Sequence, residues 1–269
     1  MRQLARSFTA FLKTGIGVML QYRGEIVLWS VWGLVNPLVL YAVFKAGAQS
    51  NPDQQIAGLS IGEVAAYFFT IMIIGHLSAA WDTHEMGWYV RTGRMSPLLL
   101  RPIMPIWKSL ADNLSYKVCT LVFVGPMWIF FALLIRPTFD TAAWQVALGL
   151  VATLLAIVLS YTFNYAVALI AFWATKLDAV GEIYFGLVMF LGGRFAPLPA
   201  MPGKIRWIAE ALPFQYMAYF PTWIFMGKVH TRSEVFLGLA AQLAWIAVSI
   251  LVLRLMWAAA VKRYTAVSG

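Results

Sequence analysis

The stretch AAWQVALGLVATLLAIVLSYTFNYAVALIAFW, residues 142–173, decides the fold class of this chain. It contains no charged residue, and a helix of about 20 apolar residues already crosses the roughly 30 Å of hydrocarbon in a bilayer. The alternation of apolar and polar residues that a membrane β-barrel requires is missing. The stretch therefore predicts a transmembrane helix that is long enough to tilt or to project beyond the bilayer.

The composition of the whole chain also indicates an integral membrane protein. Of its 269 residues, 61% are hydrophobic and 12% are charged, whereas soluble domains average about 45–50% and about 25%. A soluble globule of this composition would expose large apolar patches. The net charge of +9 would suggest a nucleic-acid partner for a soluble protein. Here the basic residues lie mostly between apolar runs, so membrane lipids and no nucleic acid are the expected partners.

Six apolar runs predict six transmembrane helices and an all-α membrane fold. Besides residues 142–173 they are Ile26–Phe44, Val64–Ala80, Val118–Ile135, Ile183–Leu191 and Val235–Ala260. With the amino terminus in the cytoplasm, 13 Lys and Arg residues fall on the inner side and seven on the outer side. The positive-inside rule thus predicts that both termini are cytoplasmic. The fifth run is short and continues into Gly192–Gly193, so its boundaries stay open.

Three segments outside the spans have their own patterns within what we expect to be a single domain, residues 1–269. In residues 1–22, apolar residues recur at helical spacing opposite Arg and Lys, which is typical of an amphipathic helix at the membrane surface. Residues 82–105 are expected to form a cytoplasmic loop with a short surface helix. Residues 192–229 combine proline with aromatic residues, which favours short re-entrant helices in the outer leaflet.

The sequence carries no recognisable catalytic motif, so no enzymatic activity and no cofactor are expected in this chain. A phosphate-binding Gly-x-x-x-x-Gly-Lys-[Ser/Thr] is missing, as is the His-Glu-x-x-His pattern. Two kinds of membrane protein stay open as alternatives for this chain. A secondary transporter or channel would require charged groups or paired broken helices within the membrane. A membrane-embedded lipid transferase would require Asp, Glu or His residues clustered near one interface. Asp82, His84 and Glu85 are the only cluster of this kind in the sequence.

Several short motifs, in order along nearly the whole chain, resemble the permeases of bacterial ABC-2-type exporters, which have an ABCG-like architecture. The stretch VRTGRMSPLLLRP, residues 90–102, is similar to the inner-loop motif of that family. Further similarities are Phe172-Trp173 at the end of the fourth run, PLPAMP at residues 197–202, LPF at 212–214, Phe220-Pro221 with Ile224 and Gly227, and Lys262-Arg263-Tyr264.

The resemblance implies the membrane subunit of an ATP-driven exporter in the bacterial inner membrane. ATP and Mg would be bound by two copies of a separate ATPase, and a second permease, usually a different homologous chain, would complete the transporter. The surface helix after the second span would dock into the ATPase through Trp88 and Tyr89, with Arg91 and Arg94 facing acidic rims; residues 176–182 are the alternative contact. The aromatic content suggests an amphipathic, drug-like or lipid-like substrate.

One residue departs from the family pattern. Arg194 follows Gly192-Gly193, where these permeases generally have small or apolar residues. An arginine facing lipid tails is costly, and Glu210 on the stretch 204–212 is the expected partner in an outer gate that closes the exit. Interaction of Arg194 with headgroup phosphates is the equal alternative.

Overall fold

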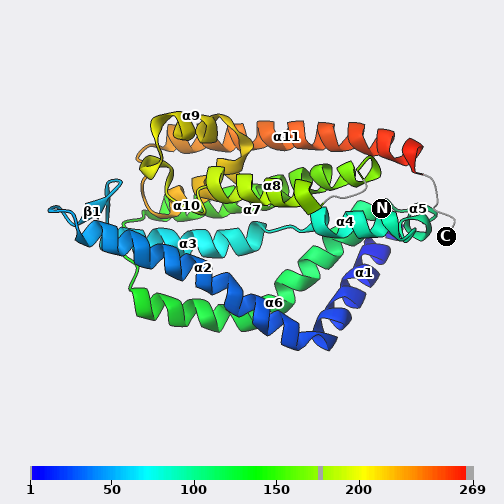
Figure 1. The fold of residues 1–269 in the computed structure, drawn as a ribbon, viewed down its shortest axis with the longest axis horizontal. Helices are drawn as coiled ribbons and strands as arrows, with labels where there is room; N and C mark the ends of the chain where they lie inside the picture. Colours follow the sequence, from blue (N-terminus) through cyan, green and yellow to red (C-terminus); the bar gives the residue numbers. More distant parts are fainter. Residues whose placement is uncertain (1, 175–177, 265–269) are drawn as a thin grey trace.

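The computed structural model describes residues 2–174 and 178–264 and is built almost entirely from helices. Figure 1 shows most of the long helices running along one axis. In chain order the elements are α1 (Arg2–Gln21), α2 (Arg23–Gln49), β1 (Gln55–Ile56), β2 (Leu59–Ser60), α3 (Ile61–Ser78), α4 (Asp82–Arg91), α5 (Ser96–Leu99), α6 (Pro105–Ile135), α7 (Ala143–Ala168), η1 (Leu169–Phe172), α8 (Asp178–Leu191), η2 (Leu198–Ala200), α9 (Gly203–Ala211), η3 (Pro213–Met217), α10 (Tyr219–Phe225) and α11 (Arg232–Arg263).

Five helical segments of the described chain are long and apolar enough to cross a membrane: 24–49, 61–91, 105–135, 143–172 and 232–263. They coincide with five of the six predicted spans, although residues 142 and 173 of the fourth run lie just outside. The remaining one, α8, has 14 residues, which at 1.5 Å per residue is about 21 Å, shorter than the hydrocarbon layer. It ends at Leu191, directly before Gly192 and Gly193. Gly193 has a φ of +77°, and the Tyr67 hydroxyl donates to its carbonyl at 2.5 Å. The six-span count therefore stays a prediction.

The third predicted span is much longer in the structure than the apolar run indicates. α6 begins at Pro105, and its first turns include polar residues that a hydropathy pattern rejects. These residues have partners: Lys108 forms an ion pair with Asp112 at 2.6 Å, and the Lys117 amine donates to the Ala79 carbonyl at 2.7 Å. The helix continues through this region because its charges are paired or hydrogen-bonded.

The predicted amphipathic helix forms as α1, and it packs on the first half of α6. Phe8 and Leu12 are partly buried while Arg6 and Lys13 are exposed. The two helices approach closely at Gly15, where an added Cβ atom would lie 2.5 Å from the hydroxyl of Ser115. An amphipathic segment thus becomes a fixed part of the helical bundle.

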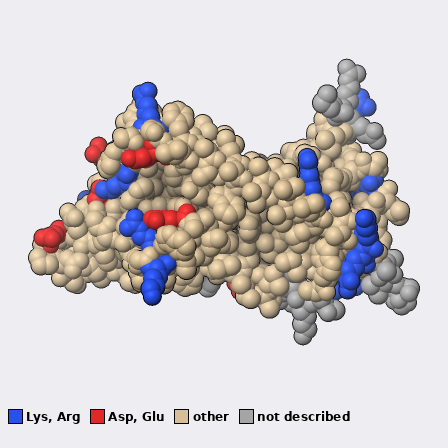
Figure 2. All heavy atoms as spheres, turned by 90° about the horizontal axis from the view of Figure 1, so that it is seen from above, with Lys and Arg blue, Asp and Glu red and all other residues tan. Residues whose placement is uncertain are grey.

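The two ends of the molecule differ in structure and in charge. α1, α4, α5 and the carboxyl end of α11 lie at one end, and the β1–β2 hairpin, α9 and α10 lie at the other (Figure 1). On the face in Figure 2, basic side chains mark the first end, both signs of charge gather at the second, and the surface between them is almost uncharged. Such a band is what a bilayer-embedded surface requires.

Residues 192–229 form short helices, η2, α9, η3 and α10, as the proline-rich pattern predicts. α10 packs against α3 and α7, and η3 packs against α7, α8 and α11. Phe214, Met217 and Tyr219 of this segment belong to a buried apolar cluster with Tyr67 and Phe68 of α3. Burial within protein satisfies the condition under which irregular backbone is tolerated at membrane depth; insertion into the outer leaflet stays a prediction.

Candidate functional site

The surface helix α4 is attached to the bundle through its first residue. The Asp82 side chain is 4% exposed and accepts hydrogen bonds from the Ser109 hydroxyl and, at 3.4 Å, from the Asn113 amide, both on α6. Ser109 also contacts the Tyr161 hydroxyl of α7 at 3.0 Å. Tyr161 in turn donates to the Ile106 carbonyl at 2.8 Å. One buried network therefore joins α4 to α6 and α7.

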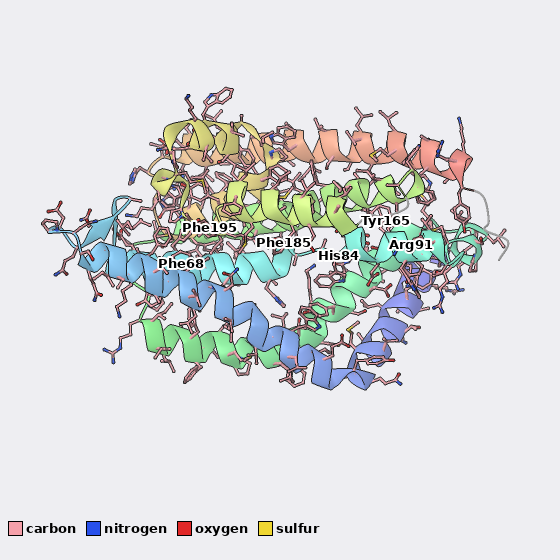
Figure 3. The ribbon with its side chains drawn as sticks, viewed as in Figure 1. Phe68, His84, Arg91, Tyr165, Phe185 and Phe195 are labelled. Atoms are coloured by element: carbon pink, nitrogen blue, oxygen red, sulfur yellow. The ribbon has the colours of Figure 1, made fainter. Side chains whose placement is uncertain are left out.

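The other end of α4 presents the predicted coupling residues at the surface. Trp88 is 41% exposed, and the guanidinium carbon of Arg94 lies 4.3 Å from the centre of a Trp88 ring. Arg91 is exposed in the last turn of α4 (Figure 3). Tyr89 is only partly buried, and its hydroxyl accepts from Lys108 at 3.4 Å. Trp88, Arg91 and Arg94 thus form an accessible group, whereas Tyr89 is directed to α6; their contact with an ATPase stays a prediction.

Three of the motifs that lie far apart in the sequence meet beside α4. The Ser96 hydroxyl contacts the Tyr264 hydroxyl at 2.8 Å, and the Tyr264 ring lies 5.8 Å from that of Phe172. Met95 is 1% exposed and closes the loop through its amide, which donates to the Tyr89 carbonyl at 3.1 Å. The loop after α4 is therefore held against η1 and the carboxyl end of α11. Lys176, in the alternative contact segment, lies outside the described residues.

Two adjoining cavities lie between α2, α3, α6 and α8. One has a volume of about 680 Å³ and reaches residues at the start of α4; the other, of about 380 Å³, extends between α2, α3 and α6. Trp29, Phe185 and Arg194 line both cavities. Phe185 lies on α8 (Figure 3). Cavities of this size are large enough for a small amphipathic molecule.

The predicted pair between Arg194 and Glu210 is wrong. Glu210 accepts instead from Arg206 at 2.7 Å on the exposed helix α9, and this hydrogen-bonded carboxylate raises the pKa of Arg206. Arg194 donates to the Ser78 hydroxyl at 3.1 Å, in the last turn of α3. Its side chain therefore points toward the α4 end of the bundle, while Glu210 pairs with the residue one helical turn before it.

An ion pair that the sequence did not predict joins the segment after α10 to α3. Lys228 donates to Glu63, which also accepts from the Ser60 amide at 2.8 Å and so caps α3. Ser60 three residues before Glu63 is a recognisable capping signal. No local signal could have revealed Lys228 as the partner, because it lies 165 residues away.

The sequence patterns did not identify the residues that hold α4 in place, which are Ser109, Asn113 and Tyr161. Ser109 and Asn113 are spaced i,i+4 and therefore share one face of α6. The sequence shows this spacing, but it does not show that this face of α6 lies against the start of α4. The described residues contain no group of three or more His, Cys, Asp or Glu side chains that could hold a metal ion.

Comparison with known proteins supports the motif evidence over most of the chain. Residues 30–268 match a family model described as ABC-2 family transporter protein. The searches of curated proteins and of solved structures gave no match. The family match includes the α4 segment, most of the residues that line the two cavities and the short helices between α8 and α11, and the chain therefore belongs to the ABC-2 family of transporter proteins.

Proposed function

We propose that this chain is the membrane subunit of an ATP-driven exporter that moves an amphipathic substrate across the bacterial inner membrane. Family membership implies association with an ABC ATPase. The observation that best supports a coupled permease is the attachment of α4: its first residue is buried in a network with α6 and α7, while its far end is accessible. A helix of this kind can receive a force at one end and transmit it at the other.

The contacts of α4 indicate which helices would move. α4 packs against α7, η1 and α8, and Asp82 connects it to α6. α6 and α8 also line the cavities. Closure of two ATPase subunits below α4 would therefore displace the cavity walls, and because packed interfaces switch between discrete arrangements, a small shift could open or close the cavities. A second permease, expected to be a different homologous chain, would complete the pathway.

Replacing Trp88 with Ala tests the coupling. We expect the complex with the ATPase to weaken and substrate-stimulated ATP hydrolysis to be lost, because exposed aromatic residues stacked with arginine are typical interface anchors. The measurement is co-purification with the ATPase, followed by ATPase activity in proteoliposomes. Trp207→Ala is the matched control, since Trp207 is 70% exposed on α9 at the other end of the bundle. Normal coupling in Trp88→Ala would place the contact elsewhere.

The orientation can be tested with single cysteines. Cys119 is 7% exposed and is the chain's single cysteine, so it gives little background labelling. Cysteines at positions 53 and 203 should react with an impermeant maleimide in intact cells, and one at position 5 only after permeabilisation. External labelling at position 5 would contradict cytoplasmic termini. Transport that continues without the ATPase would favour a secondary transporter or channel instead.

A further inference from the structure

The smaller cavity combines apolar walls with a single charged side chain. Most of its lining is apolar and includes Leu34, Met72, Val124 and Trp128, while Ser30, Asn36 and His76 are further polar residues in it. Arg194 is the one Lys, Arg, Asp or Glu in its lining within the part of the chain that the structure describes. Its volume of about 380 Å³ falls within the range of small-molecule sites. A cation in an apolar surrounding favours a ligand with a negative charge.

The Arg194 guanidinium is incompletely satisfied by the protein. One terminal nitrogen donates to Ser78 at 3.1 Å, whereas Nε is buried without a hydrogen-bond partner. None of the three ion pairs among the described residues includes Arg194. It lies against α3 beside Gly75, where an added Cβ atom would be 3.5 Å from the guanidinium carbon, an ordinary van der Waals distance. Arg194 is only partly exposed, so its charge is unfavourable without a counterion, and an anionic ligand would provide one.

We infer that the smaller cavity binds an anionic amphiphile, whose charged group contacts Arg194 and whose apolar body lies against Trp128, Met72 and Leu34. This inference rests on the proposed function and specifies the substrate class of the same membrane subunit. The ligand would carry a sulfonate, phosphate or carboxylate, groups that accept hydrogen bonds from guanidinium with favourable geometry. Trp29 and Phe185 line both cavities and would contact the ligand where it passes between them.

The larger cavity serves as the route to this site. Its lining includes Glu25, His84 and Glu85 as well as Arg194. Two carboxylates oppose the accumulation of an anion there, while Arg194 attracts it at the junction with the smaller cavity. The carboxylates therefore disfavour retention of an anionic ligand in the larger cavity, and Arg194 favours its binding in the smaller one.

A pair of fluorescent probes tests the charge requirement. 1-Anilinonaphthalene-8-sulfonate and N-phenyl-1-naphthylamine share their ring system and differ by the sulfonate. Both are titrated into the full chain in phosphatidylcholine nanodiscs, with empty nanodiscs subtracted. We expect Arg194→Gln to weaken binding of the sulfonate by at least about tenfold, the loss of a charged hydrogen bond, and to leave the neutral probe unchanged. Arg206→Gln, which removes an exposed arginine from α9, should affect neither probe.

If Arg194→Gln fails to fold, Ser78→Asp tests whether the sulfonate probe binds through Arg194. It supplies the carboxylate that Arg194 lacks, so the protein keeps a paired charge but should lose the sulfonate probe; Ser78→Asn is the matched control and should retain it. Equal affinity of the two probes for the wild type, or sulfonate binding that survives Arg194→Gln or Ser78→Asp, would overturn the inference. Binding needs no ATPase, so failure of ATP-driven transport would refute the proposed function separately.

The same assay distinguishes two sources of the ligand. Phosphatidylglycerol added to the nanodiscs should displace the sulfonate probe if the natural ligand is an anionic lipid. Undiminished probe binding would identify a dissolved anionic amphiphile instead. In either case Arg194 is the group that recognises the charge.

Discussion

The ion pair between Lys228 and Glu63 should hold the segment after α10 against the start of α3. Glu63 accepts from Lys228 and from the Ser60 amide at the same time. Glu63→Gln keeps an acceptor for the Ser60 cap and removes the charge, whereas Lys228→Met removes the amine and keeps the apolar side chain. The two variants and their combination form a double-mutant cycle that isolates the ion pair.

The exposure of the two side chains sets the expected magnitude. The Lys228 and Glu63 side chains are 23% and 28% exposed, between the fully exposed pairs that contribute about 0.2–1 kcal/mol and the charged hydrogen bonds that contribute about 1.5–3 kcal/mol. A coupling free energy of about 1 kcal/mol is therefore expected. It should fall when NaCl is raised from about 0.1 M to about 1 M, because the Debye length shortens from about 10 Å to about 3 Å.

The assay is reversible unfolding in mixed micelles with increasing dodecyl sulfate, followed by circular dichroism. Arg206 and Glu210, which are 47% and 44% exposed and spaced i,i+4, provide a control pair with an expected coupling of about 0.3–0.5 kcal/mol. A cycle between Arg194 and Glu210 should be additive, since each has another partner. Additivity within about 0.3 kcal/mol for Lys228 and Glu63 would refute the reasoning.

Two further predictions concern close backbone approaches. Gly15→Ala should cost about 1–3 kcal/mol, because its Cβ atom would lie 2.5 Å from the Ser115 hydroxyl; Gly17→Ala, with no atom within 4 Å, should be neutral or stabilising by up to about 1 kcal/mol. Equal melting temperatures of the two variants in detergent would contradict the packing of α1 on α6. Gly227→Ala should cost more than about 2 kcal/mol, since φ is +70° and the Cβ atom would overlap the Asp140 carbonyl; unchanged thermal stability would exclude this contact.

The transmembrane helices were predictable because insertion depends mainly on the local apolar content of each segment. α2 and α11 contain their predicted runs, and α3 and α7 cover most of theirs. The start of α6 was predicted too late, because Lys108, Asp112 and Lys117 lower its hydropathy although their partners in the fold stabilise them. The coupling group was predictable only in part: Trp88 and Arg94 stack at the surface, but the orientation of Tyr89 toward α6 depends on how α4 packs.

By itself the sequence determined the membrane class, five of the helices, the amphipathic first segment and the family, since each of these depends on short-range composition or on motifs in order along the chain. The tertiary structure alone decided which polar side chains meet. Arg194 lies beside Ser78, Asp82 beside Ser109, and Glu63 beside Lys228. The physical reason is that a side chain reaches only a few ångströms, so its partner depends on the crossing and rotation of packed helices, which residues distant in the sequence determine together.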